Sequence, residues 1–131
     1  MTGLDTNIIV RYVLQDDPVQ AAAVSRLIDS FTVDEPGFIS MVVMTEFIWV
    51  LQTNYRSERN AIEHVIEALL RTRELRIERE DLIWQALRMY IRGNADFADC
   101  LIHCCGHSAG CSYTMTFDRK AAKTAGMKLL F

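Results

Sequence analysis

The stretch Phe38–Leu51, FISMVVMTEFIWVL, decides the fold class of this chain. Its first part, Phe38–Met41, follows a turn at residues 34–37 (DEPG) and has the apolar composition of a short strand. The next part, Val42–Tyr55, is apolar on nearly every side, so it predicts a helix that is largely buried. A strand that leads directly into a helix is the repeating unit of α/β folds.

The same alternation of strand and helix continues on both sides of this stretch. We therefore predict an α/β fold in which a parallel sheet is flanked by helices on both faces. Ligands of such sheets bind beyond the carboxyl ends of the strands, so the functional site should lie there. The expected strands are Thr2–Leu4, Phe38–Met41, Leu75–Ile77, Cys111–Phe117 and Lys128–Phe131, and the expected helices are Thr6–Gln15, 18–30, Val42–Tyr55, Glu58–Leu70, Asp81–Ile91, Phe97–Ala109 and Lys120–Ala125.

The length and composition of the chain are those of one ordinary domain. It has 131 residues, of which 50% are hydrophobic, so we expect a single domain over residues 1–131 with a real core. No apolar run reaches the roughly 20 residues of a membrane helix. The N-terminus also lacks a basic region followed by a long apolar stretch. These features predict a cytoplasmic protein that does not enter a membrane.

The four cysteines all lie between positions 100 and 111. Such crowding is a poor framework for joining distant segments, so reduced thiols in a reducing compartment are expected. Cys100, Cys104, His107 and Cys111 share one face of an ideal helix, but ligands spread so far along a straight helix cannot surround one zinc ion. We therefore expect the cysteines to serve as small apolar packing residues.

The formal net charge of −3 is not that of a high-affinity nucleic-acid binder, although the charge is unevenly distributed. Residues 1–54 carry two basic and seven acidic side chains, whereas residues 55–131 carry twelve basic and ten acidic ones. The basic run Arg71–Arg79 is interleaved with glutamates and is expected on a solvated face. Three basic residues that closely follow Asp118 are better placed to contact a phosphate backbone. They are Arg119, Lys120 and Lys123.

Asp5 and Asp118 each follow directly on a predicted strand. Both are therefore expected at the carboxyl edge of the sheet, where a ligand site would form. The alternative for each is a purely structural role, because aspartate after a strand is a favoured N-cap of the next helix.

Glu46 is harder to explain as a structural residue. The sequence of its helix is apolar nearly all round, and an isolated charge buried in such a helix costs several kcal/mol. Such a carboxylate must be protonated, paired with an arginine or bound to a metal ion. It also lies about one turn into its helix and leans back toward the helix N-terminus, which is the same predicted edge as Asp5.

Asp96 and Asp99 lie at the start of a predicted helix, three positions apart. One interpretation is local: Asp96 caps the helix and Asp99 stabilises its first turn through the helix dipole. The other is that Asp99, and with it Asp96, faces a metal ion. A cluster of carboxylates without histidine suits Mg²⁺ or Mn²⁺ better than zinc. The candidate metal ligands are Asp5, Glu46, Asp96, Asp99 and Asp118.

Four short motifs, in this order, resemble the PIN-domain family and, more narrowly, VapC-type toxins of toxin–antitoxin pairs. They are Gly3-Leu4-Asp5-Thr6-Asn7, Thr45-Glu46, Asp96-Phe97-Ala98-Asp99-Cys100-Leu101-Ile102 and Thr116-Phe117-Asp118-Arg119. The resemblance covers essentially the whole chain, although Cys100, Cys104 and Cys105 stand where small residues such as alanine are expected.

The resemblance implies a parallel five-stranded sheet and an endoribonuclease that depends on Mg²⁺ or Mn²⁺. It implies Asp5, Glu46, Asp99 and Asp118 as the catalytic acids, supported through hydrogen bonds by Asn7 and Thr116. It also implies an RNA substrate, a cognate antitoxin and a homodimer. With the metal chemistry of the carboxylates, it predicts a toxin that hydrolyses RNA phosphodiester bonds.

Two alternatives remain open. The first is a non-catalytic module that binds a metal or a partner. It would have the same fold but would not cleave RNA. A metal-dependent phosphatase on a similar sheet is disfavoured, because the first strand ends in Asp5-Thr6-Asn7 and not in two aspartates around one residue.

Overall fold

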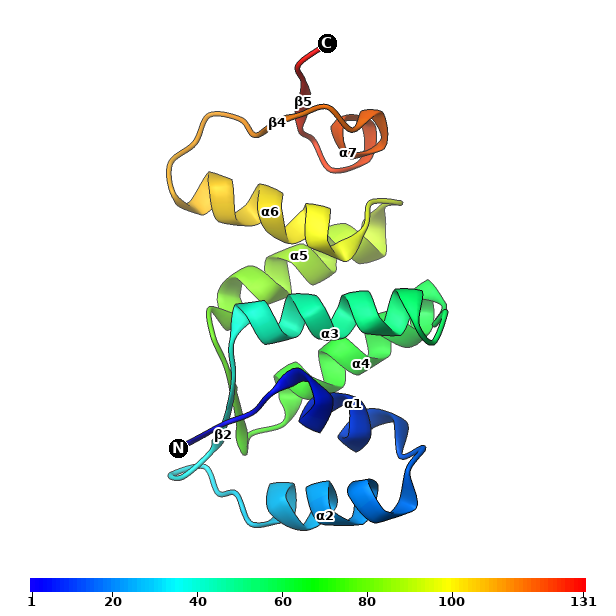
Figure 1. Ribbon diagram of the computed structural model, residues 1–131. Helices are drawn as coiled ribbons and strands as arrows, with labels where there is room; N and C mark the ends of the chain where they lie inside the picture. Colours follow the sequence, from blue (N-terminus) through cyan, green and yellow to red (C-terminus); the bar gives the residue numbers. More distant parts are fainter. The chain divides into compact units, whose positions relative to one another are not determined.

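A computed structural model describes all residues, 1–131, and contains every predicted element in the predicted order (Figure 1). Backbone contacts divide the chain into two compact units, Met1–Glu78 and Arg79–Phe131. The strands are β1 Thr2–Gly3, β2 Gly37–Ile39, β3 Leu75–Ile77, β4 Met115–Thr116 and β5 Lys128–Leu129. The helices are α1 Thr6–Leu14, α2 Pro18–Asp29, α3 Met41–Thr53, α4 Arg59–Arg71, α5 Glu80–Arg92, α6 Phe97–Ser108 and α7 Arg119–Thr124.

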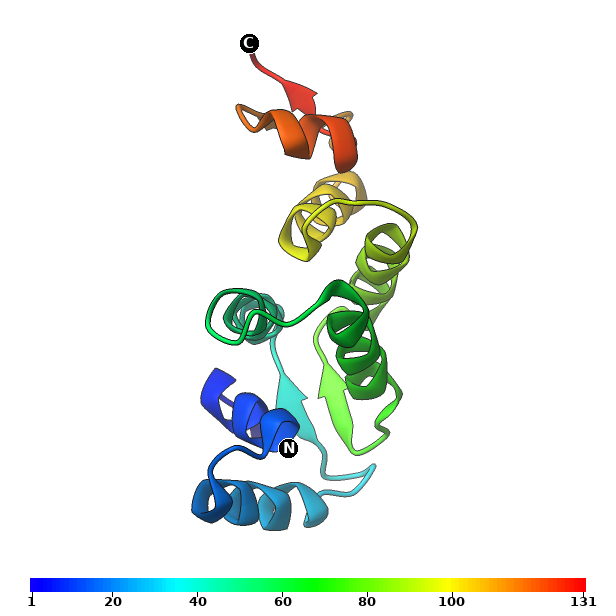
Figure 2. The same cartoon turned by 90° about the vertical axis from the view of Figure 1, so that its right-hand side faces the viewer.

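The first unit is built on a parallel sheet of strand order β1-β2-β3. β2 is the central strand, and Gly37 at its start lies opposite Thr2 of β1 and Leu75 of β3. A Cβ at position 37 would lie only 2.7 Å from the ring of Phe31, so this close packing requires glycine. Figure 2 shows β2 and β3 as neighbouring cyan and green arrows. Because the strands are parallel, the residues that follow β1 and β2 lie at the same edge.

Four helices complete the first unit. Helix α1 contacts both α2 and α3, and α4 contacts β3. Each helix contributes an apolar stripe to the core, which is how an amphipathic helix contributes to stability. The most deeply buried side chains of this core are Ile9, Ile39, Met44, Phe47, Leu51, Ile62 and Ile66.

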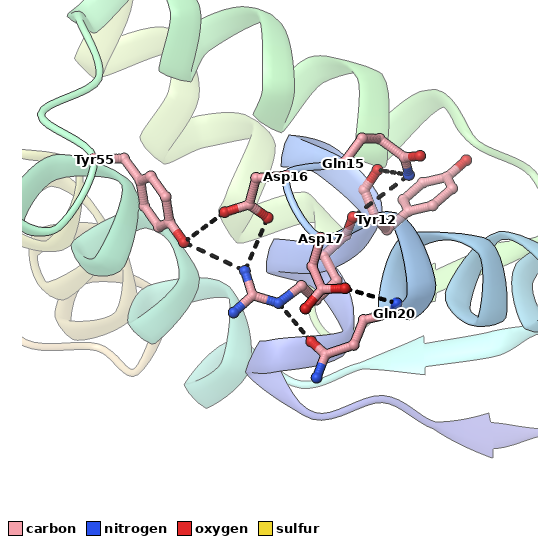
Figure 3. Close-up of polar contacts among 7 residues, drawn as sticks. Tyr12, Gln15, Asp16, Asp17, Gln20 and Tyr55 are labelled. Carbon is pink, nitrogen blue, oxygen red and sulfur yellow. Dashed lines mark hydrogen bonds and ion pairs between the residues drawn. The ribbon is translucent and has the colours of Figure 1, made fainter.

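Arg11 ties the end of α1 to two neighbouring segments, and Figure 3 labels its partners Asp16, Gln20 and Tyr55. Its guanidinium donates to Gln20 of α2 at 2.7 Å and to Asp16 at 2.9 Å. A third, longer contact of 3.4 Å reaches the hydroxyl of Tyr55, just beyond α3. The hydrogen bond to Tyr55 and the charge of Asp16 raise the pKa of Arg11. This network fixes the α1–α2 junction.

The second unit combines a helical pair with a small sheet. Helices α5 and α6 lie side by side, and α7 contacts both strands of the parallel β4–β5 sheet (Figures 1 and 2). The rings of Tyr90 and Phe97 meet edge to face with their centroids 6.0 Å apart. Beside them, the sulfur atoms of Met89 and Cys104 approach to 3.5 Å. These contacts join α5 to α6 through apolar packing.

The α/β class is confirmed, but the sheet differs from the prediction. The strands form a three-stranded sheet and a separate two-stranded sheet, and not one five-stranded sheet. The predicted strand Cys111–Phe117 is shortened to Met115–Thr116. Its first residues instead close the end of α6, where Gly110 has a positive φ of 97° and the Cys111 N–H donates to the carbonyl of Gly106. This is a helix C-terminal cap, which β-forming composition alone does not reveal.

The prediction that α3 is buried on nearly all sides is wrong. Val42 is 77% exposed, Trp49 is 58% exposed, and Glu46 lies on the same exposed face. The opposite face carries Met44 and Phe47, which are fully buried. An apolar sequence therefore concealed an ordinary two-sided helix, because apolar residues also occupy its solvent-facing positions.

All four cysteines are free, as predicted. Cys100 and Cys104 are buried and serve as apolar packing residues, whereas Cys111 is exposed, contrary to the packing role expected for it. The longest helices of this chain, α3, α4 and α5, have 13 residues each, and none of the seven helices is both long and apolar enough to span a bilayer.

Candidate functional site

Asp5 and Glu46 are connected through Thr6 at the carboxyl edge of the three-stranded sheet. Asp5 follows β1 as the N-cap residue of α1, and its Oδ1 accepts a 2.8 Å hydrogen bond from the backbone N–H of Thr6. The Thr6 hydroxyl donates to Oε1 of Glu46, which lies in the second turn of α3. Thr6 is buried, while both carboxylates are exposed. Two acids that follow neighbouring strands are thus held at one edge.

Thr6 is the residue of this group that the sequence did not reveal. Its position beside Asp5 was the available signal, since a hydroxyl at the first helical position can face the same edge as the acid. The partner of Glu46 is this neutral hydroxyl, where one interpretation expected an arginine. Because Glu46 is exposed, water solvates its charge and a full counter-charge is not required. Asn7, the other expected supporting residue here, is also exposed.

Asp118 occupies the corresponding position in the second unit, two residues after the last residue of β4. It is the N-cap of α7, and its Oδ1 accepts from the N–H groups of Lys120 at 2.8 Å and Ala121 at 3.1 Å. The Thr116 hydroxyl accepts a hydrogen bond from the Asp118 N–H at 3.0 Å, so Thr116 positions the acid through its backbone. The capping interpretation is therefore confirmed for Asp118, as it is for Asp5. Both cap contacts of Asp118 end on Oδ1, which leaves Oδ2 outside the cap.

Asp96 and Asp99 differ in their surroundings. Asp96 has the backbone position of an N-cap, but its side chain makes no capping hydrogen bond, contrary to the local interpretation. Its carboxylate instead pairs with Lys120 at 3.9 Å, a contact that is largely solvated. Asp99 is half-buried in the first turn of α6. Burial raises the pKa of Asp99, the charges of Asp96 and Asp118 raise it further, and Lys120 acts in the opposite direction.

Replacing Asp99 with asparagine is expected to stabilise the second unit at neutral pH. A carboxylate whose pKa is raised on folding binds its proton more tightly in the native state than in the unfolded chain. The ionised group therefore costs stability above the raised pKa, and this cost disappears as the pH falls toward the unfolded value. The gain of Asp99→Asn over wild type should shrink at acidic pH, as measured by urea unfolding in the presence of a chelator.

Asp81 provides a control of opposite sign for this measurement. It also lies in the first turn of a helix, but hydrogen bonds from Arg79 lower its pKa. Asp81→Asn should therefore cost stability at neutral pH and lose its effect as the pH falls below the unfolded value. Equal changes for the two variants would mean that burial and the neighbouring carboxylates do not destabilise ionised Asp99.

The donor chemistry of both groups fits a hard divalent cation. The acidic side chains offer only carboxylate oxygens, and oxygen atoms are the ligands that Mg²⁺ prefers. No histidine or cysteine belongs to either group of acids. Burial, and next to it the repulsion from Asp96 and Asp118, raises the pKa of Asp99, and a bound cation would instead favour the ionised carboxylate. Within either unit, no three side chains of His, Cys, Asp or Glu lie close enough together to hold a metal ion. The metal-binding role of the acids therefore stays a prediction.

Comparisons with known proteins identify the family of this chain. A model of the PIN domain family matches residues 4–127, and the chain belongs to that family. Over 124 residues it is 23% identical to a VapC ribonuclease from Aquifex aeolicus (strain VF5). That alignment covers 94% of this chain and 91% of the relative. The resemblance to VapC-type PIN proteins drawn from the short motifs is confirmed.

Proposed function

We propose that this chain is an endoribonuclease that depends on Mg²⁺ or Mn²⁺ and acts as the toxin of a VapBC-type toxin–antitoxin pair. The observation that carries the proposal is the link between Asp5 and Glu46 through Thr6 at the ends of two neighbouring strands. It is supported by membership of the PIN domain family and by the similarity to a VapC ribonuclease.

The acids have separate roles in this proposal. Asp5, Glu46, Asp99 and Asp118 would hold the metal, with Asp96 beside them. The bound cation would activate a water molecule and stabilise the leaving oxygen of a phosphodiester. Thr6 orients Glu46, and the cap contacts of Asp5 and Asp118 fix their carboxylates. The exposed side chains of Arg119 and Lys123 would contact the RNA backbone.

The test of this function is cleavage of labelled RNA by purified protein free of any antitoxin. We expect cleavage with Mn²⁺ or Mg²⁺ and none in excess chelator, restored when metal is added back. Equal cleavage in chelator would exclude the metal mechanism. Metal binding without cleavage, together with normal growth of cells that express the chain alone, would favour the non-catalytic module.

Thr6→Val is expected to weaken Mn²⁺ binding and RNA cleavage by roughly 10- to 100-fold, the usual effect of losing a residue that orients a metal ligand. Valine has a similar shape but cannot donate to Glu46. Thr6→Ser keeps the hydroxyl and should retain most of the affinity. Calorimetric titration with Mn²⁺ gives the affinity independently of cleavage. Equal losses in the serine and valine variants would show that packing at position 6, and not the hydroxyl, is what matters.

The proposed partners are a cognate antitoxin and a second copy of the chain, in the cytoplasm. The exposed apolar residues of α3, Val42 and Trp49, are candidates for such contacts. Light scattering of the purified chain measures whether it is a dimer, and co-expression with the neighbouring reading frame tests for the antitoxin.

A further inference from the structure

A cluster of basic side chains on helices α5 and α6 has no part in the proposed metal chemistry. Arg88 and Arg92 lie on α5, and His103 and His107 lie on α6. Within each pair the residues are four positions apart, so both members lie on the same side of their helix. All four side chains line one pocket of about 210 Å³.

The charged side chains that line this pocket are all basic. None of the side chains that line it is acidic, in a chain whose net charge is −3. The apolar part comes from Met89 and the buried Cys104, whose sulfur atoms are 3.5 Å apart. Arg88 is close enough to Cys104 to lower its pKa, although burial and the neighbouring Cys105 raise the pKa overall. Cationic groups around an apolar base are suited to an anion.

The two histidines are arranged in parallel. The rings of His103 and His107 are stacked with their centroids 6.5 Å apart and their planes 5° from parallel. The backbone of Gly126 borders the ring of His103, because a Cβ there would lie 3.5 Å from Cε1. Each imidazole supplies at least one N–H donor whatever its protonation state. With the forked donors of the arginines, the pocket offers several donors and no carboxylate.

We propose that this pocket binds a phosphate group of a single-stranded RNA. The guanidinium fork matches phosphate oxygens in a bidentate geometry. The pocket is smaller than the roughly 300–1,000 Å³ of sites that enclose a drug-sized ligand, so it suits one phosphate and its sugar better than a peptide helix. The choice of RNA rests on the proposed function, since RNA is the substrate that this function supplies. The pocket would thus position the strand on α5 and α6.

The experiment measures binding of a labelled RNA oligonucleotide to the full chain in excess chelator, so that no cleavage is needed. The double variant Arg88→Gln/Arg92→Gln should bind about tenfold more weakly or worse, as expected when charged hydrogen bonds are lost. The slope of log affinity against log salt should become shallower by about 1.4, since each contact on a single strand contributes roughly 0.7. The matched control is Arg73→Gln/Arg76→Gln, which removes two exposed arginines elsewhere and should change binding little.

Equal losses for the two double variants would mean that only overall charge matters and would overturn the pocket. Unchanged binding by the Arg88→Gln/Arg92→Gln variant would overturn it as well. NMR signals of His103 and His107 should shift with RNA, and inorganic phosphate should compete. If phosphate shifts them and RNA does not, the pocket takes a free anion and the RNA assignment is wrong. If a polyglutamate peptide displaces RNA at a lower concentration than inorganic phosphate does, the pocket binds an acidic protein and the RNA assignment is wrong.

The outcomes separate this proposal from the proposed function. If the chain binds RNA through this pocket in chelator but does not cleave RNA with Mn²⁺, the proposed nuclease function is contradicted and the proposed RNA-binding pocket is not. A chain that cleaves RNA with Mn²⁺, while its Arg88→Gln/Arg92→Gln variant binds normally, contradicts the pocket alone.

Discussion

Replacing Asp5 with asparagine is expected to lower the rate of metal-dependent RNA cleavage by more than about a hundredfold, since even residues behind the ligands cost roughly 10- to 100-fold. The substitution removes one negative charge and changes little else. Asparagine keeps the Oδ1 that accepts from the Thr6 N–H, and it is as good an N-cap as aspartate. Helix α1 should therefore form as before, with a weaker cation ligand at its start. Initial rates of RNA cleavage at saturating Mn²⁺ measure the effect.

Asp17 offers a matched control for this variant. It caps α2 as Asp5 caps α1, and its Oδ1 accepts a 3.1 Å hydrogen bond from the Gln20 N–H. Asp17→Asn makes the same chemical change at a cap with no place in the proposed site, so it should cleave RNA like the wild type. If the two variants lose activity equally, the effect comes from the caps or the overall charge, and Asp5 is not a ligand.

Replacing Phe97 with alanine is expected to lower the free energy of unfolding by about 3–5 kcal/mol, a large share of the roughly 5–15 kcal/mol of a typical domain. The ring is fully buried and meets Tyr90 edge to face at 6.0 Å. Alanine leaves a cavity between α5 and α6 and removes an aromatic pair that adds about 0.5–1.5 kcal/mol beyond its buried area. Urea unfolding followed by circular dichroism measures the loss.

Two further variants test the assignment of Phe97 to the core. Phe97→Leu keeps most of the apolar volume and should cost much less than the alanine variant. Ile102→Ala lies on the same helix at a 51% exposed position and should change stability by no more than about 0.5 kcal/mol. A loss from Phe97→Ala no larger than that from Ile102→Ala would contradict a structural role for the ring. Because Phe97 lies between Asp96 and Asp99 in sequence, its loss should also disturb these acids.

The sequence predicted the order of all elements and the placement of two acids with little ambiguity. Asp5 and Asp118 each stand between a β-forming run and a helical run, and that pattern specifies both a strand end and a cap. The ends of β4 were not predictable from composition. Residues 111–114 are rich in β-formers, but Gly110 and the Cys111 N–H first complete the end of α6. The pairing of strands into two sheets depends on long-range contacts, which local patterns do not encode.

The acids on helices were predicted less well. For Glu46, the reasoning depended on burial, and burial is a tertiary property that an apolar helix sequence overstates when hydrophobic residues also face solvent. For Asp96, the capping pattern was correct for the backbone, while the side chain turned to Lys120 on a helix distant in sequence. Thr6 and the arginines of α5 were missed, since single hydroxyls and i,i+4 cations are common on any helix surface.

The division of the acids between two units has a consequence for the order of events during translation. Ribosomes make a chain from its N-terminus, and domains fold as units as they emerge. The unit Met1–Glu78, which contains Asp5 and Glu46, has therefore been synthesised in full before Asp96, Asp99 and Asp118 are added to the chain. Under the proposed function, a nascent chain remains inactive toward RNA until Asp118 has emerged, which delays its toxicity until late in synthesis.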